Sequence, residues 1–142
     1  MIPQAAMRIS QADQDIFASI RRAVIQLPDD LQDEDGQVIN LTCHNLAMAV
    51  GYAFRLRWQH GYYASPAYPH SWVILNKHVV DVYPVAMLGG PVLLDGESFI
   101  VQHLYMPQPT IAVSQKHFHN PVFRRHVATI HHSLKQHPRL PL

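Results

Sequence analysis

Two runs of β-branched and aromatic residues, joined by a two-residue turn, constrain the fold of this chain more than any other feature. His70–Leu75 and His78–Tyr83 each have the composition of a β-strand, and Asn76-Lys77 between them fits a tight turn. A hairpin about this turn pairs the two residues that flank it, which sets the register of the rest. In that register Asp81 lies diagonally from His70 on the same face of the sheet, within reach of its imidazole. The hairpin therefore predicts a histidine–aspartate pair.

The only cysteine lies at the start of a predicted helix. Apolar residues recur at three- and four-residue spacing after Cys43, so the pattern predicts a helix that begins near Thr42, runs toward Gln59 and is ended by Gly61. Unpaired backbone N–H groups and the positive end of the helix dipole favour a thiolate at this position and can hold an oxyanion. A buried structural cysteine is the alternative interpretation of Cys43.

A packing helix is predicted toward each end of the chain. Ser10 can cap a first helix whose apolar stripe continues to Leu27, and Pro28 ends that pattern. Asn120-Pro121 has the form of a helix start. The residues after it form another apolar stripe: Val122, Phe123, Val127, Ile130 and Leu134.

The segment between the hairpin and the last helix is less regular. Pro91–Gly96 fits a short apolar strand or an ordered loop, and Thr110–Ser114 fits a final strand. Ser98–Tyr105 is apolar enough for a strand or a short helix, and its pattern favours neither. Together the segments predict an α+β fold in which the helix that carries Cys43 packs on a small antiparallel sheet, with flanking helices at both termini.

The composition fits one small domain and argues against several classes of partner. At 142 residues and 48% hydrophobic, the chain has the size of a single domain, residues 1–142. Its formal net charge of +1 gives no electrostatic reason to expect nucleic acid or a membrane as a partner. One cysteine permits no internal disulfide, which fits a reducing compartment. Because no secretory signal and no apolar run of membrane-spanning length is recognisable, we expect a soluble, cytoplasmic protein.

The chemistry-bearing residues resemble those of a known superfamily. Cys43 at a helix start, His70 and Trp72 at the opening of a strand, and Asp81 followed by Val82-Tyr83-Pro84 occur in this order. This order resembles the transglutaminase-like branch of the papain-like cysteine hydrolases. The resemblance implies a papain-like or transglutaminase-like core. It also implies that Cys43 is the nucleophile, His70 the base and Asp81 the acid that orients the base.

Three further residues are candidates for the oxyanion site or the cleft. Gln37 lies six residues before Cys43, as the oxyanion-hole glutamine does in papain-like proteases, and an ordinary loop residue is the alternative interpretation. His44 follows the cysteine directly, but neighbours on a helix point about 100° apart, so we expect His44 to line the cleft or to cap the helix. Trp72 is expected in the core or in a cleft wall.

The implied reaction is acyl transfer through a thioester, with a peptide, a protein or an amide as the substrate. Water as the acceptor would make the protein a protease, amidase or deamidase, and an amine would make it a transglutaminase. The sequence specifies neither the acceptor nor the oligomeric state, and we expect no cofactor. No metal is expected either, because the histidines and Cys43 lack the spacing of a zinc motif. The alternatives are a catalytically silent papain-like module that binds a peptide or protein, and a histidine-rich metal-binding protein.

Overall fold

The computed structural model describes residues 9–83, 90–108 and 120–136, which form an α+β fold. These residues contain four helices and a five-stranded antiparallel sheet with the strand order β4-β3-β2-β1-β5. Along the chain the elements are α1 (Gln11–Ile25), α2 (Cys43–Phe54), β1 (Arg57–Tyr63), β2 (Pro69–Leu75), β3 (His78–Asp81), β4 (Val92–Leu94), α3 (Phe99–Leu104), β5 (Tyr105–Pro107) and α5 (Pro121–Gln136). None of the helices in these ranges is both long enough and apolar enough to cross a membrane.

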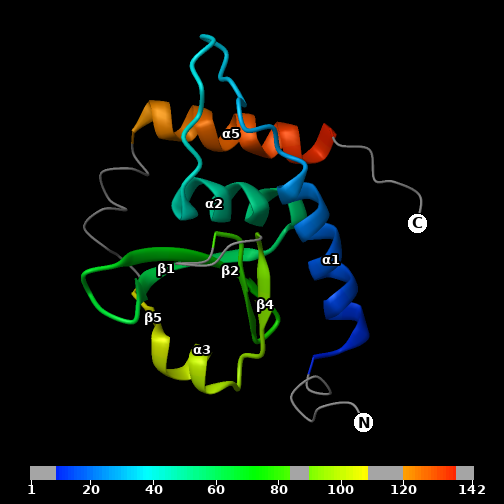
Figure 1. Ribbon diagram of the computed structural model, residues 1–142, viewed down its shortest axis with the longest axis vertical. Helices are drawn as coiled ribbons and strands as arrows, with labels where there is room; N and C mark the ends of the chain where they lie inside the picture. The colour runs from blue at the N-terminus through cyan, green and yellow to red at the C-terminus, as the bar shows by residue number, and fades with distance from the viewer. Residues whose placement is uncertain (1–8, 84–89, 109–119, 137–142) are drawn as a thin grey trace.

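Helices cover both faces of the sheet. In Figure 1, α2 lies on one face with α5 stacked across it, and α1 runs along the side next to β4. Helix α3 packs against the opposite face. The prediction that Cys43 lies at the start of a helix that packs on an antiparallel sheet is confirmed, and the helix begins at Cys43 itself.

The two terminal helices begin where the sequence predicts. Ser10 Oγ accepts an N–H of the first turn of α1, and Asn120 Oδ1 accepts the Val122 N–H at the start of α5. Helix α1 ends at Ile25, two residues before the predicted end, although Leu27 is still buried in the core. Val122 is exposed, and the other residues of the predicted α5 stripe are buried: Phe123, Val127, Ile130 and Leu134.

The prediction that the helix from Thr42 continues toward Gln59 is wrong. Helix α2 ends at Phe54, because Arg55 adopts a left-handed conformation (φ 57°) that closes the helix. Residues 57–63 form strand β1 instead, paired with β2 on one side and β5 on the other. Over so few residues, apolar spacing fits a short strand as well as the last turns of a helix.

The central hairpin has the predicted strands, turn and register. Strands β2 and β3 pair with Leu75 opposite His78, and Asn76 has the left-handed conformation expected in the turn (φ 55°). Strand β3 ends at Asp81, two residues before the predicted Tyr83. Because the register is kept, successive residues of β2 alternate between the two faces of the sheet as expected.

The segment after the hairpin contains a strand and a short helix. Strand β4 pairs with β3, which confirms the strand alternative for Pro91–Gly96. Ser98 caps α3, so most of Ser98–Tyr105 is helical, and Tyr105 begins β5. The predicted strand Thr110–Ser114 lies outside the described residues.

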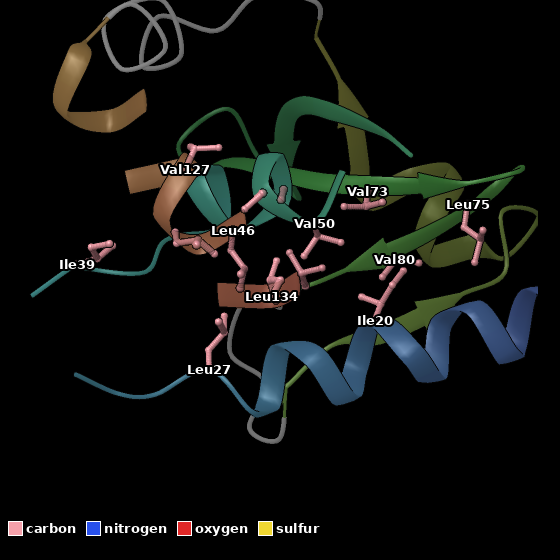
Figure 2. Packing of buried hydrophobic residues seen from close by; sticks show 14 of the residues in the cluster. Ile20, Leu27, Ile39, Leu46, Val50, Val73, Leu75, Val80, Val127 and Leu134 are labelled. Atoms are coloured by element: carbon pink, nitrogen blue, oxygen red, sulfur yellow. The ribbon is translucent and has the colours of Figure 1, made fainter. Parts of the chain in front are cut away.

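Each face of the sheet has its own hydrophobic cluster. The larger cluster joins α1, α2 and α5 to one face of β2 and β3 (Figure 2), and includes Ile20, Val50, Leu134, Val73 and Val80. The smaller cluster lies on the other face, where Trp72, Val79 and Tyr105 pack with α3. Since Trp72 and Val73 are neighbours, β2 supplies side chains to both clusters. Polar residues of this buried strand therefore need hydrogen-bond partners on both faces.

Gly61, expected from the sequence to end a helix, lies within β1 beside β5. A Cβ at this position would overlap the Met106 carbonyl oxygen and lie 2.9 Å from the Trp72 ring. We expect Gly61→Ala to push β5 away from β1 and to lower the free energy of unfolding by about 1–3 kcal/mol, the usual cost of overpacking. Chemical denaturation measures this change, and an unaltered midpoint would contradict the close approach of the two strands.

Candidate functional site

Cys43 is the first residue of α2 and lies in a firmly capped turn. The Thr42 side chain accepts the Asn45 N–H, and the Asn45 side chain accepts the Thr42 N–H in return. Asn45 is buried and also donates to the Asn40 carbonyl oxygen. This interlocked cap gives the thiol a defined position at the positive end of the helix dipole.

The contact that the hairpin predicts between His70 and Asp81 is present. His70 Nε2 lies 2.8 Å from Asp81 Oδ2, and the two side chains are 2% and 1% exposed. They come from adjacent antiparallel strands and lie diagonally on one face. Since Nε2 is bound to Asp81, Nδ1 is the His70 nitrogen that remains to interact with Cys43.

Two further donors hold the Asp81 carboxylate. Tyr105 Oη donates to Oδ2 at 2.5 Å, and the Tyr83 N–H donates to Oδ1 at 3.2 Å. The Trp72 ring is buried beside them, with centroid distances of 6.2 Å to His70 and 5.1 Å to Tyr105. Trp72 is thus a core residue on this face, and Tyr105 is a site residue that the sequence pattern did not identify.

Cys43 and His70 change each other's proton affinity in opposite directions. Burial acts to raise the pKa of the Cys43 thiol, but hydrogen bonds and charge from His44 and His70 outweigh burial and lower that pKa to about 6. Burial acts to lower the pKa of His70, but hydrogen bonds and charge from Asp81 and Cys43 raise it to about 9. Between these two values a thiolate beside an imidazolium is the favoured form.

A second hydrogen-bonded group lies on the other face of β2. The fully buried Ser71 hydroxyl is 2.6 Å from His44 Nδ1 and 2.6 Å from His60 Nδ1, and so connects α2 with β1. Hydrogen bonding and charge from His44 also lower the pKa of the Cys43 thiol. The pKa of the thiol therefore depends on one histidine from each group, His70 of the hairpin pair and His44 of the group around Ser71.

Sequence reasoning missed Ser71 and His60. The alternation of β2 places Ser71 on the face opposite to its neighbour His70, but its partner could be found only from the pairing of β1. In the structure His60 lies directly opposite Ser71 in that pairing. The apolar pattern predicts a helix toward Gln59 with Gly61 as its end, and a helix there gives no sign of a bridge from His60 to Ser71.

Gln37 is hydrogen-bonded within its own turn. Its N–H donates to Asp33 Oδ1 and its carbonyl oxygen accepts the Asp33 N–H. This turn contacts α5, where His126 lies 3.2 Å from Asp33 Oδ2, and the Gln37 side chain is exposed. These contacts fit the interpretation of Gln37 as a loop residue rather than as an oxyanion donor.

The described ranges hold no group of three or more histidine, cysteine, aspartate or glutamate side chains arranged to bind a metal ion. Comparison of the chain with protein-family models, with curated proteins and with solved structures found no match. The residues and geometry of the site therefore carry the assignment of function.

Proposed function

We propose that this protein is a thiol-dependent acyl hydrolase or acyltransferase that acts through a Cys43–His70–Asp81 triad. The observation that carries the proposal is the buried His70–Asp81 contact of 2.8 Å on the sheet against which the Cys43 helix packs. It is supported by the coupling of Cys43 and His70, in which the thiol pKa is lowered while the imidazole pKa is raised. A merely structural buried cysteine would have the opposite shift, because burial in apolar surroundings raises a thiol pKa. The direction of the shift is that of an activated nucleophile.

The fold supports the same proposal. A nucleophile at the start of a helix that packs on an antiparallel sheet, with base and acid on adjacent strands, resembles the papain-like and transglutaminase-like cysteine hydrolases. Here α2 carries the nucleophile, β2 the base and β3 the acid. The chain order of the three residues is also that of the transglutaminase-like branch.

In the proposed mechanism the Cys43 thiolate attacks the substrate carbonyl carbon, and a C–S bond forms while an electron pair moves onto the oxygen. Collapse of this intermediate breaks the bond to the leaving amine, which takes the Nδ1 proton of His70 and leaves a thioester on Cys43. Water or a second amine then attacks the thioester, gives a proton to His70 and releases the thiolate. Asp81 keeps a proton on Nε2 and stabilises the imidazolium, while Tyr105 holds the carboxylate.

The tetrahedral intermediate also needs donors for its negatively charged oxygen. The capping box binds the N–H groups of Thr42 and Asn45, and the Leu46 N–H bonds to the Thr42 carbonyl oxygen. The Cys43 N–H is the first of α2, so we assign it to the oxyanion. Because this N–H and the sulfur belong to the same residue, both can act on one substrate carbonyl: the sulfur attacks the carbon and the N–H binds the oxygen.

The proposal predicts that Cys43 reacts as a thiolate well below the pH at which an ordinary cysteine does. We expect the rate of Cys43 alkylation by iodoacetamide to rise with an inflection near pH 6, because the thiol is protonated below this pH and ionised above it. A cysteine peptide measured alongside should have its inflection at about pH 8.5. Intact-mass spectrometry follows both reactions, and Cys43 is the only thiol in the chain.

A panel of substrates then identifies the reaction. Peptides, glutamine side chains, isopeptides and small amides are each supplied with and without an amine acceptor, and formation of the thioester on Cys43 is followed by mass. If Cys43 is no more reactive than the peptide at neutral pH, the triad fails. A catalytically silent module that binds a peptide or protein then becomes the better interpretation.

A further inference from the structure

Ser71 and two histidines form a hydrogen-bonded chain that leads away from the thiol. Cys43 interacts with His44, whose Nδ1 lies 2.6 Å from Ser71 Oγ, and the same oxygen lies 2.6 Å from His60 Nδ1. The ring centroids of His44 and His60 are 6.4 Å apart, so the serine hydroxyl, rather than a direct contact, joins the two imidazoles.

The far end of this chain lies at a pocket. His60 lines a cavity of about 580 Å³, together with residues of α2, β1 and α5 that include Met48, Tyr52, Trp58 and Arg124. This volume and this mixture of aromatic and polar lining are typical of sites that admit small molecules and water. The three side chains therefore connect the Cys43 site with a pocket on the face of the sheet opposite to that of His70.

The hydrogen-bonded chain of His44, Ser71 and His60 contains few protons. Burial and the charge of His44 lower the pKa of His60 to about 4, so His60 is neutral at pH 7 and carries one ring proton. Ser71 has one hydroxyl proton and can donate it to only one Nδ1 atom. When both rings are neutral, the other ring must donate its own Nδ1–H to Ser71 Oγ. Two arrangements keep the Ser71 proton between the two rings, and they differ by a shift of every proton along this hydrogen-bonded chain. In a third, both rings donate Nδ1–H to Ser71 Oγ, and no proton can pass between them through the serine.

We propose that His44, Ser71 and His60 form a proton relay between the Cys43 site and the pocket. In one direction, His44 gives its Nε2 proton to a group bound at Cys43, and its Nδ1 takes the Ser71 hydroxyl proton. Ser71 Oγ then takes the Nδ1 proton of His60, and His60 Nε2 takes a proton from water in the pocket. One proton has moved toward the thiol and all three residues are neutral again, and the reverse sequence removes a proton.

The relay deepens the proposed function and rests on it, because it serves the acyl transfer at Cys43. It supplements His70, which remains the base of the triad. Other titratable and charged groups face its two ends: His70 beside Cys43, and Arg124 and His131 in the lining of the pocket. The tests therefore compare variants that differ only at His44, Ser71 or His60.

Nitrogen-15 NMR of the imidazole rings tests the arrangement of protons. In the wild-type protein at neutral pH we expect one of His44 and His60 to carry its proton on Nδ1 and the other on Nε2. The variants His44→Gln and His60→Gln assign the two signals. If both rings carry their proton on the same nitrogen, whether Nε2 or Nδ1, the relay is wrong, and this wild-type spectrum decides the matter even where a Ser71 variant does not fold.

The pH profile of Cys43 alkylation tests the connection to the thiol. We expect Ser71→Ala to move the inflection upward by roughly 0.5–1 pH unit, the effect of about one hydrogen bond. His60→Gln should give the same shift. The double variant, Ser71→Ala with His60→Gln, should give no larger shift, because both changes interrupt the same hydrogen-bonded path. Ser71→Thr keeps the hydroxyl and should restore the wild-type profile.

Ser10→Ala is the matched control, because it removes a hydroxyl that caps α1 far along the chain from the site. This variant should keep the wild-type inflection. Additive shifts of Ser71→Ala and His60→Gln, or no shift in either, would overturn the relay. A wild-type inflection equal to that of a cysteine peptide would instead contradict the proposed function, so the two failures are distinguishable.

Discussion

His70→Gln should move the inflection of Cys43 alkylation from about pH 6 toward pH 9.0 and remove nearly all acyl-transfer activity. Without the imidazolium, burial raises the thiol pKa against the hydrogen bond and charge of His44 alone. At pH 7 the thiolate fraction then falls by up to about 100-fold, but a more basic thiolate is intrinsically more nucleophilic, so alkylation slows only several-fold. Turnover of an amide also needs His70 as acid and base, and should fall by a further factor of about 10²–10⁴.

His78→Gln is the matched control for this experiment. Both histidines lie on the central hairpin and are 2% exposed, but His78 accepts the Gly96 N–H and lies 3.8 Å from Asp13. Its replacement should change the free energy of unfolding and leave the alkylation inflection near pH 6. Equal shifts in the two variants would mean that the inflection reports a general loss of structure, and the role of His70 as the base would be contradicted.

Asp81→Asn should lower turnover by about 10²–10⁴ and bring the pKa of His70 down from about 9. Burial alone lowers the pKa of His70, and the hydrogen bond to Asp81 is the first of the effects that raise it. The amide of Asn has no negative charge, and its N–H₂ can donate to Nε2. The neutral ring must then carry its proton on Nδ1, where it cannot accept the thiol proton of Cys43.

Two measurements separate this effect from a change in folding. NMR titration of the His70 ring gives its pKa directly, and thioester formation on Cys43 gives the rate of acylation. The matched control is Asp95→Asn, which replaces another buried carboxylate, 3.7 Å from the imidazole of His78. Asp95→Asn should alter neither measurement, and wild-type turnover in Asp81→Asn would rule out an orienting role for Asp81.

Several features of the site could be predicted because they depend on residues close together in the chain. A two-residue turn and the alternation of side chains set the hairpin register, so the contact between His70 and Asp81 follows without any other segment. The cap of α2 likewise forms between Thr42 and Asn45, three residues apart. Such contacts form wherever the local structure forms.

The extent of α2 could not be predicted in the same way. Arg55 ends the helix with a positive φ, a conformation that its residue type seldom adopts and that no local pattern indicated. Residues 57–63 are a strand because β2 and β5 pair with them on both sides. These partners lie many residues away, so the strand and the position of His60 emerged only from the assembled sheet.

The sequence by itself determined a thiol at a helix N-terminus and an imidazole beside a carboxylate, since short-range geometry places each of them. Only the tertiary structure decided what meets at the thiol. Docking of α2 on the sheet brings His70 to Cys43 and Ser71 to His44, and β5 brings Tyr105 to Asp81 across 24 residues. These contacts depend on the burial of two hydrophobic clusters, one on each face of strand β2. That burial requires the whole fold.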